Sequence, residues 1–123
     1  MIKDSNRPRR VAELLKRELA MIIPRELDDS LAHRITLTHV EVLPDYSVAK
    51  VFFTVLGGAD APREATRALK RAAGFLRHAL AGRVVLRAIP ALRFYYDESV
   101  ERGARLTSLI ERAIAEDKTH PKD

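Results

Sequence analysis

The chain contains no cysteine among its 123 residues. This absence excludes a disulfide framework, a thiol nucleophile and a zinc site with sulfur ligands. Long apolar runs are also missing, since none approaches the roughly 20 residues that a transmembrane helix needs. The first ten residues are polar and hold no apolar signal core. We therefore expect a cytoplasmic protein with no membrane partner.

Motifs of catalysis and cofactor binding are absent as well. The sequence has no phosphate-loop lysine motif, no dinucleotide glycine fingerprint and no G-x-S-x-G elbow. No two of its histidines have the i, i+4 spacing of a helical metal pair; they are His33, His39, His78 and His120. Asp97, Glu98 and Glu101 cluster at an expected helix start, where capping fits better than acid–base catalysis. We expect no enzyme, no metal and no cofactor.

Basic charge is plentiful and unevenly distributed. Lys and Arg number 22 against 17 Asp and Glu, which gives a net charge of +5. Residues 1–25 hold seven basic and three acidic side chains, and residues 61–93 hold eight and one. Such an excess on a small domain favours a polyanionic partner. The lesser alternative is two solvated helix faces that keep the protein soluble.

The first predicted helix precedes Pro24, which we expect to end it. Ser5 or Asn6 can cap its start, and Pro8 suits the first turn, where a missing N–H costs no hydrogen bond. Residues 25–34 are polar and predict a loop. The apolar side chains of the helix recur at steps of three and four, and they are Val11, Leu14, Leu15, Leu19, Ile22 and Ile23.

Three extended segments are predicted. Residues 35–43 and 47–56 flank a Pro-Asp turn signal and should form an antiparallel hairpin. The alternation of 35–43 changes phase midway, so either its threonines share a face with its later valines or a bulge restores the phase. Residues 84–96 form the third segment, which Pro90 interrupts.

Two further helices follow from the pattern. One begins at Pro62, passes through Gly74 and stops near Gly82. A glycine inside a helix suggests a kink or a close backbone approach. The last helix begins near 97–99, and residues 118–123 should be a frayed end. Its apolar stripe, which we expect to be buried, is Val100, Leu106, Leu109, Ile110, Ala113 and Ile114.

The order helix, strand, strand, bent helix, strand, helix predicts one α+β domain over residues 1–123. We expect two layers, with a three-stranded sheet covered by helices on one face. The other sheet face can stay in water. This order fits a type II KH domain, although no pair of glycines has the G-x-x-G spacing of the KH clamp. Ala72-Ala73-Gly74 would take the place of that loop, as a helix–kink–helix.

RNA is the polyanion that the basic pattern favours. Arginine and lysine along one helix face can contact successive phosphates without reading sequence. The candidates in the second block are Arg63, Arg67, Lys70, Arg71, Arg77 and Arg83, and those in the first block are Arg7, Arg9 and Arg10. The two blocks form one positive surface if folding brings them together. Tyr95 and Tyr96 either stack on bases or lie half in the core of the domain.

The chain resembles bacterial ribosome-binding factor A over nearly its full length. The resemblance is carried by residues 10–14, 17–20, 40–42, 44–45, 49–51 and 55–57, and most specifically by AAGFLR at 72–77 and PALRFYYD at 90–97. It implies a KH-like type II fold in which Ala72 and Gly74 form the kink.

The same resemblance implies a function. Members of this family bind the free small (30S) ribosomal subunit and its 16S rRNA, assist late maturation including 5′-end processing, and support growth in the cold. We expect a monomer with this role. The alternative is a protein-interaction module that uses its open sheet face, with basic charge serving solubility.

Overall fold

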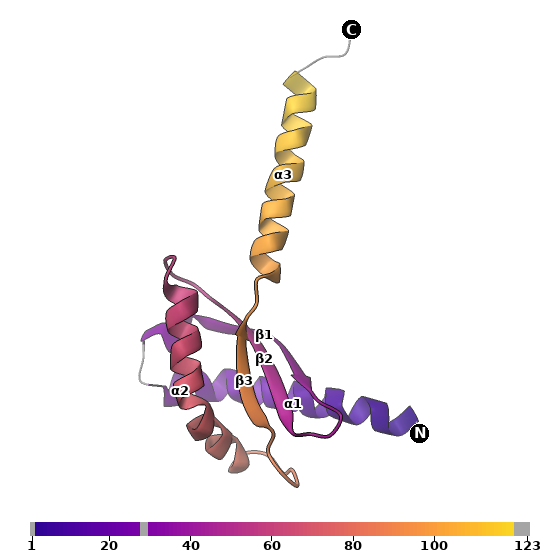
Figure 1. Ribbon diagram of the computed structural model, residues 1–123, viewed down its shortest axis with the longest axis vertical. Coiled ribbons are helices and arrows are strands. Elements are labelled where there is room, and N and C mark those ends of the chain that lie inside the picture. The colour runs from indigo at the N-terminus through magenta and orange to yellow at the C-terminus, as the bar shows by residue number, and fades with distance from the viewer. Residues whose placement is uncertain (1, 28–29, 120–123) are drawn as a thin grey trace.

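The computed structural model describes residues 2–27 and 30–119. Its elements in chain order are α1 (Ile2–Glu26), the 3-10 helix η1 (Ser30–Arg34), β1 (Ile35–Val42), β2 (Val48–Val55), α2 (Ala61–Ala81), β3 (Ala91–Tyr96) and α3 (Ser99–Thr119). Helices α1 and α2 cover one face of the sheet, and α3 projects away from both layers (Figure 1). The predicted α+β architecture with a three-stranded sheet is therefore confirmed.

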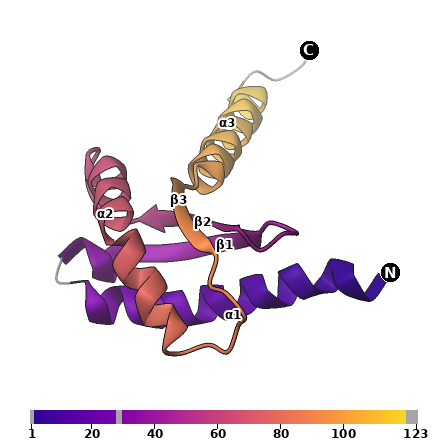
Figure 2. The same ribbon diagram turned by 60° about the horizontal axis from the view of Figure 1, so that its bottom comes forward.

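The sheet is mixed. Its strand order is β1-β2-β3, with β1 antiparallel to β2 and β2 parallel to β3. A tight hairpin joins the antiparallel pair, whereas parallel neighbours need a long crossover. Helix α2 supplies that crossover, and it therefore lies against the sheet beside α1 (Figure 2).

A bulge interrupts β1 at Thr38. The register with β2 shifts between Leu37 and His39, which leaves Thr38 without a partner residue on β2. Leu37 before the bulge and Val40 after it are both buried. Of the two interpretations of the phase change, the bulge is confirmed.

The hydrophobic core lies between the sheet and the two covering helices. Phe53 and Val51 of β2 are fully buried at its centre. Helix α1 adds Leu15, Leu19 and Ile23, and α2 adds Leu69, Leu76 and Leu80. Full burial of a side chain of this size contributes about 1.5–3 kcal/mol. The core thus fixes α1 and α2 against each other and presents their outer sides to solvent.

Helix α1 is longer than predicted at both ends. It begins at Ile2, upstream of the expected caps, and it contains Pro8 and Pro24. The turn around Pro24 is held by the buried Ile23, whose carbonyl accepts a hydrogen bond of 3.1 Å from the N–H of Leu27. The predicted loop 25–34 also contains η1, because Leu31 and its neighbour Ala32 are buried. Asp28 and Asp29 lie outside the described residues.

Helix α2 runs without interruption through Ala72 and Gly74. It changes direction along its length (Figure 2). A Cβ atom placed on Gly74 would meet no atom within 4 Å beyond its chain neighbours and the adjoining backbone of its own helix, so the suggested close backbone approach is wrong. The assignment of the bend to these two residues stays a prediction.

The third strand is shorter than the predicted segment 84–96. Pairing starts only where the N–H of Ala91 donates to the Ser47 carbonyl at 3.0 Å. The preceding proline, Pro90, is fully buried and has no N–H to donate to a ladder. Residues 82–90 therefore form an irregular segment that returns from α2 to the sheet.

Helix α3 begins as predicted but is not buried. The N–H of Ser99 donates to Oδ1 of Asp97 at 2.9 Å, which is a capping contact. The predicted buried stripe is wrong, because Leu106, Leu109, Ile110 and Ile114 are 50–60% exposed and Ala113 is also exposed. The periodicity of this stripe does indicate an apolar face of α3. The face stays exposed because α1 and α2 already occupy the covered side of the sheet. The side chain of Val100 and residues 120–123 lie outside the described part.

Candidate nucleic-acid interface

The outer side of α2 carries a basic stripe. Arg63, Arg67, Lys70 and Arg71 are all exposed, as their helical spacing predicts. Ala65 and Leu69 on the opposite side of the helix are fully buried. Three residues of the stripe, Arg63, Arg67 and Lys70, line a shallow hollow of about 400 Å³ beside Tyr96 of β3. The stripe therefore lies along the junction between α2 and the edge of the sheet.

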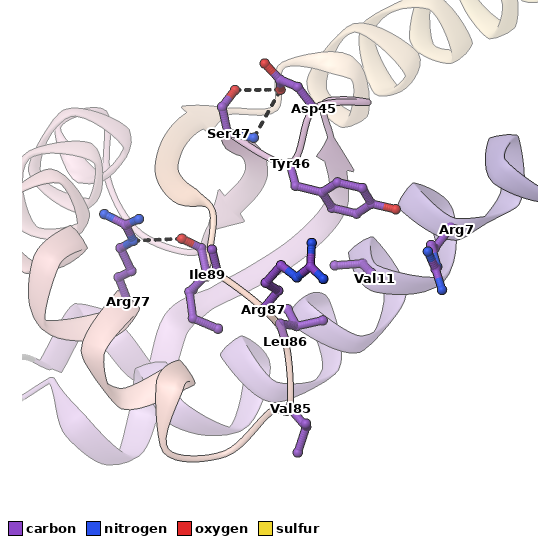
Figure 3. Close-up of a pocket in the computed structure, with 11 residues that line it drawn as sticks. Arg7, Val11, Asp45, Tyr46, Ser47, Arg77, Val85, Leu86, Arg87 and Ile89 are labelled. Atoms are coloured by element: carbon purple, nitrogen blue, oxygen red, sulfur yellow. Dashed lines mark hydrogen bonds between the residues drawn. The ribbon is translucent and has the colours of Figure 1, made fainter.

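A larger hollow joins the two basic blocks. It has a volume of about 850 Å³ and lies between α1, the β1–β2 turn and the irregular segment after α2. Arg7 from α1, Arg77 from α2 and Arg87 from the segment all line it (Figure 3). Folding thus brings Arg7 of the first block beside two arginines of the second.

Apolar and aromatic groups complete this hollow. The ring of Tyr46 points from the hairpin turn toward α1, and the side chain of Arg87 reaches toward Val11 (Figure 3). Tyr46 has φ of 61°, a left-handed conformation that non-glycine residues adopt rarely. Tyr46 is half-buried against the core, and it contributes its ring to the lining of the hollow.

One carboxylate accompanies the three arginines. Asp45 accepts a hydrogen bond of 2.7 Å from the Ser47 hydroxyl and one of 3.1 Å from the Ser47 N–H. These bonds, the hydroxyl's first, lower the pKa of Asp45 from its ordinary value. Asp45 is therefore charged at neutral pH, but its hydrogen-bonding capacity is directed at its own turn. The arginines outnumber it and leave the hollow positive.

Arg77 has a structural contact as well as an exposed position. Its Nε donates a hydrogen bond of 2.9 Å to the carbonyl of Ile89. This contact ties the irregular segment to α2 and so helps to place Arg87. The other guanidinium N–H groups of Arg77 remain available for an anionic ligand.

Arg83 is used differently from the other candidates. Its Nε lies 2.7 Å from Oε2 of Glu18, and the two side chains are 36% and 16% exposed. The pair joins α1 to the turn after α2 and neutralises part of the charge of Arg83. The geometry thus gives Arg83 a structural role ahead of any ligand contact.

The remaining candidates do not converge on the larger hollow. Arg9 lines a separate hollow of about 430 Å³ with Lys16 and His39, on the β1 side of α1. Arg10 is exposed on α1. The sequence patterns missed Arg87, because it falls in a stretch that alternated like a strand. They also missed Tyr46, which stands in a turn without a motif.

Other kinds of site find no support in the described part of the chain. Among residues 2–27 and 30–119, no three His, Asp or Glu side chains gather as a metal site. No helix in these ranges is long and apolar enough to cross a membrane.

The fold and its charge define the class of protein. A mixed three-stranded sheet with two helices on one face, in the order α-β-β-α-β-α, is the arrangement of a KH-like domain. The model of the ribosome-binding factor A family matches residues 7–110. The chain therefore belongs to the ribosome-binding factor A family.

Similar proteins extend over almost the whole chain. Ribosome-binding factor A of Nitrosomonas eutropha is 54% identical over 114 residues, which cover 93% of this chain and 97% of the relative. The protein of the same name from Thiobacillus denitrificans is 48% identical over 123 residues, covering 100% and 99%.

Solved structures agree with the fold. The crystal structure of ribosome-binding factor A from Thermus thermophilus has a TM-score of 0.64 at 34% identity and covers 72% of this chain and 93% of its own. A homology model of the Thermus thermophilus factor, fitted into a cryo-electron microscopy map of its complex with the 30S subunit, has a TM-score of 0.58 at 34% identity. It covers 71% of this chain and 91% of the other.

Proposed function

We propose that this protein binds the free 30S subunit through its 16S rRNA and assists late maturation of that RNA, including processing at the 5′ end. In this role it acts in the cytoplasm, as a monomer, without catalysing a reaction itself. The supporting observation is the convergence of Arg7, Arg77 and Arg87 on one hollow, next to the basic stripe of α2. The 30S complex of the Thermus thermophilus relative supports the same partner.

The chemistry of the surface suits an RNA backbone. Guanidinium groups donate paired hydrogen bonds to phosphate oxygens and keep their charge at any physiological pH. Arg67, Lys70 and Arg71 follow one another along α2, so they can meet phosphates of a continuous strand. Such contacts hold the RNA without selecting its sequence, which fits a factor that recognises a folded subunit.

The orientation of the basic groups depends on a rigid frame. The Glu18–Arg83 pair fixes the turn after α2 against α1, and the Arg77–Ile89 hydrogen bond fixes the segment that carries Arg87. A frame that is set before binding lowers the entropy cost of ordering side chains on the RNA. Phosphate contacts by Arg77 and Arg87 are part of this proposal.

The test of this proposal is the salt dependence of binding to purified small subunits. Phosphate contacts release counterions, so the affinity should fall steeply between about 50 and 200 mM salt. Replacement of Arg87 by glutamine should reduce the logarithmic slope by roughly one for the lost phosphate contact. An affinity that barely changes with salt would contradict the proposal and favour the protein-interaction alternative.

A further inference from the structure

The sheet face opposite α1 and α2 carries an aromatic strip. His39, Phe52 and Tyr95 stand side by side in the registers of the three strands. The ring centroids of His39 and Phe52 are 5.9 Å apart, and those of Phe52 and Tyr95 are 5.5 Å apart. The planes of each pair are tilted by only 33° and 30°. The three rings thus pack against one another as one aromatic row across the sheet, with the exposed Tyr95 at one end.

This strip is open to solvent in the described structure. Tyr95 is 40% exposed, His39 is exposed and Phe52 is half-buried. In Figure 2, α1 runs below the sheet and α2 passes its left end toward α1, whereas α3 rises away from the sheet. The strip therefore has room for a ligand that lies across the strands.

Two cations lie directly beside the rings. Lys50 and Arg93 are register partners one row along from Phe52 and Tyr95, on the same face of the sheet. Within residues 2–27 and 30–119, neither side chain belongs to an ion pair. The strip is therefore bordered by two positive charges on one side.

Two carboxylates border the same face. Lys50 on β2 lies between two register partners, Glu41 on β1 and Arg93 on β3. Asp97 accepts a hydrogen bond of 2.5 Å from the Thr38 hydroxyl and one of 2.9 Å from the Ser99 N–H. These bonds direct the oxygens of Asp97 toward the bulge and the start of α3. The Arg93 side of the strip is consequently the positive side.

We propose that this aromatic strip binds the bases of single-stranded RNA by stacking, with Lys50 and Arg93 on the adjoining phosphates. Every nucleobase has a π face that stacks on aromatic side chains, and sheets that carry aromatic rows use this mode. An apolar protein partner is disfavoured, since the core of a protein interface is depleted of charged residues and this strip adjoins Lys50, Arg93 and Glu41. The inference rests on the proposed function and adds a second RNA surface, on the side of the sheet away from α2.

The test is a substitution series at Tyr95 with a uridine oligonucleotide of about twelve nucleotides as the probe. Tyr95→Phe keeps the ring and should bind as the unaltered protein does. Tyr95→Leu keeps the apolar bulk without a π face, and Tyr95→Ala removes both. Each should lose roughly 5- to 150-fold in affinity, the range measured for loss of one stacked base. If Tyr95→Leu bound the oligonucleotide as tightly as Tyr95→Phe, the inference would be overturned. That result would point to an apolar protein partner.

A control lies on α3, away from both proposed RNA surfaces. Leu109 is 58% exposed, so Leu109→Ala removes exposed apolar bulk outside the strip. It should leave oligonucleotide affinity unchanged. A loss equal to that of Tyr95→Leu would overturn the inference, because the effect would not belong to the strip.

A second measurement retains an aromatic ring at the site. The chain has no tryptophan, so Tyr95→Trp places a single indole reporter in the strip. Stacking of a base on the indole should quench its emission as oligonucleotide is added. Unchanged emission at saturating oligonucleotide would overturn the inference even if the leucine variant were destabilised.

The outcomes separate this inference from the proposed function. Suppose that charge reversal on α2 abolishes subunit binding while every Tyr95 variant binds oligonucleotide normally. The proposed function then stands and the strip is overturned. If instead the protein ignores small subunits but the oligonucleotide shows the expected order at Tyr95, the strip is supported and the proposed function fails.

Discussion

Nε of Arg83 lies 2.7 Å from Oε2 of Glu18, and this ion pair joins α1 to the turn after α2. The two residues are 65 positions apart in sequence, and each lies in one of the two basic blocks. Because Glu18 is mostly buried and Arg83 is not, the pair differs from an ordinary surface contact. The ion pair distinguishes Arg83 from the other arginines of the predicted RNA-binding set, because it makes Arg83 link two parts of the domain.

We expect this pair to stabilise the fold without binding RNA directly. Glu18→Gln and Arg83→Gln should each lower the free energy of unfolding, with a coupling energy of about 0.2–1 kcal/mol in a double-mutant cycle. Urea denaturation of the four proteins measures this coupling. Additive effects of the two substitutions would show that the ion pair contributes nothing in solution.

Gly74 offers a second test of stability. Its surroundings are open, so a side chain meets no steric conflict there. Replacement by alanine should raise the free energy of unfolding by up to about 1 kcal/mol, the propensity difference inside a helix. A clear loss of stability in Gly74→Ala would mean that the bend of α2 requires glycine, and subunit binding of that variant would then show whether the bend serves function.

The start of α3 should respond to alkaline pH. The phenol of Tyr96 donates a hydrogen bond of 2.6 Å to Oε1 of Glu101, and this bond, with burial and nearby carboxylates, raises the pKa of Tyr96 from 10.0 to about 12. A raised pKa in the folded state means that the stabilisation is complete below about pH 10 and is lost as the pH rises through about 12.

Absorbance of tyrosinate as a function of pH measures this pKa. Glu101→Gln removes the main cause and should bring the pKa of Tyr96 back toward its ordinary value. Tyr96→Phe should delete the highest of the titration steps, whereas Tyr95→Phe should keep it. If the last step persisted in Tyr96→Phe, the assignment would be wrong.

The exposed stripe of α3 predicts tolerance to charge. Leu109 and Ile110 are 58% and 52% exposed, so Leu109→Asp or Ile110→Asp should change the free energy of unfolding by less than about 0.5 kcal/mol. Leu69→Asp on α2 is the buried contrast and should be severely destabilising. Thermal melting compares them, and a large loss at Leu109 would mean that α3 packs against the domain in solution.

The sequence predicted the parts of the fold that local pattern controls. Apolar residues at steps of three and four located α1 and α2, and unbroken alternation located β2, whose Ala49, Val51 and Phe53 are fully buried. The bulge at Thr38 was foreseeable because the phase change had to be resolved in one of two ways. The exposure of the α2 arginines followed from the same periodicity.

Features that depend on contacts between residues far apart in the chain could not be predicted from the sequence. The stripe of α3 has the same spacing as a buried face, and only the complete packing of α1 and α2 shows that nothing in the described chain covers it. From the sequence alone, Arg83 and Arg71 were equivalent candidates for RNA binding. Only the fold shows that Arg83 forms an ion pair with Glu18. The sequence raised base stacking at Tyr95, but it could not predict the aromatic strip, since His39, Phe52 and Tyr95 come together only through the register of three strands.

The most direct measurement of the central claim is cosedimentation of a charge-reversed protein with small ribosomal subunits. Replacing Arg67, Lys70 and Arg71 together by glutamate reverses three exposed charges on α2 and leaves the core untouched. Circular dichroism should show near-normal folding, because exposed substitutions usually cost less than about 0.5 kcal/mol each. The account predicts strongly weakened cosedimentation at physiological salt. Unchanged cosedimentation of the folded variant would contradict it and exclude this face as the RNA-binding surface.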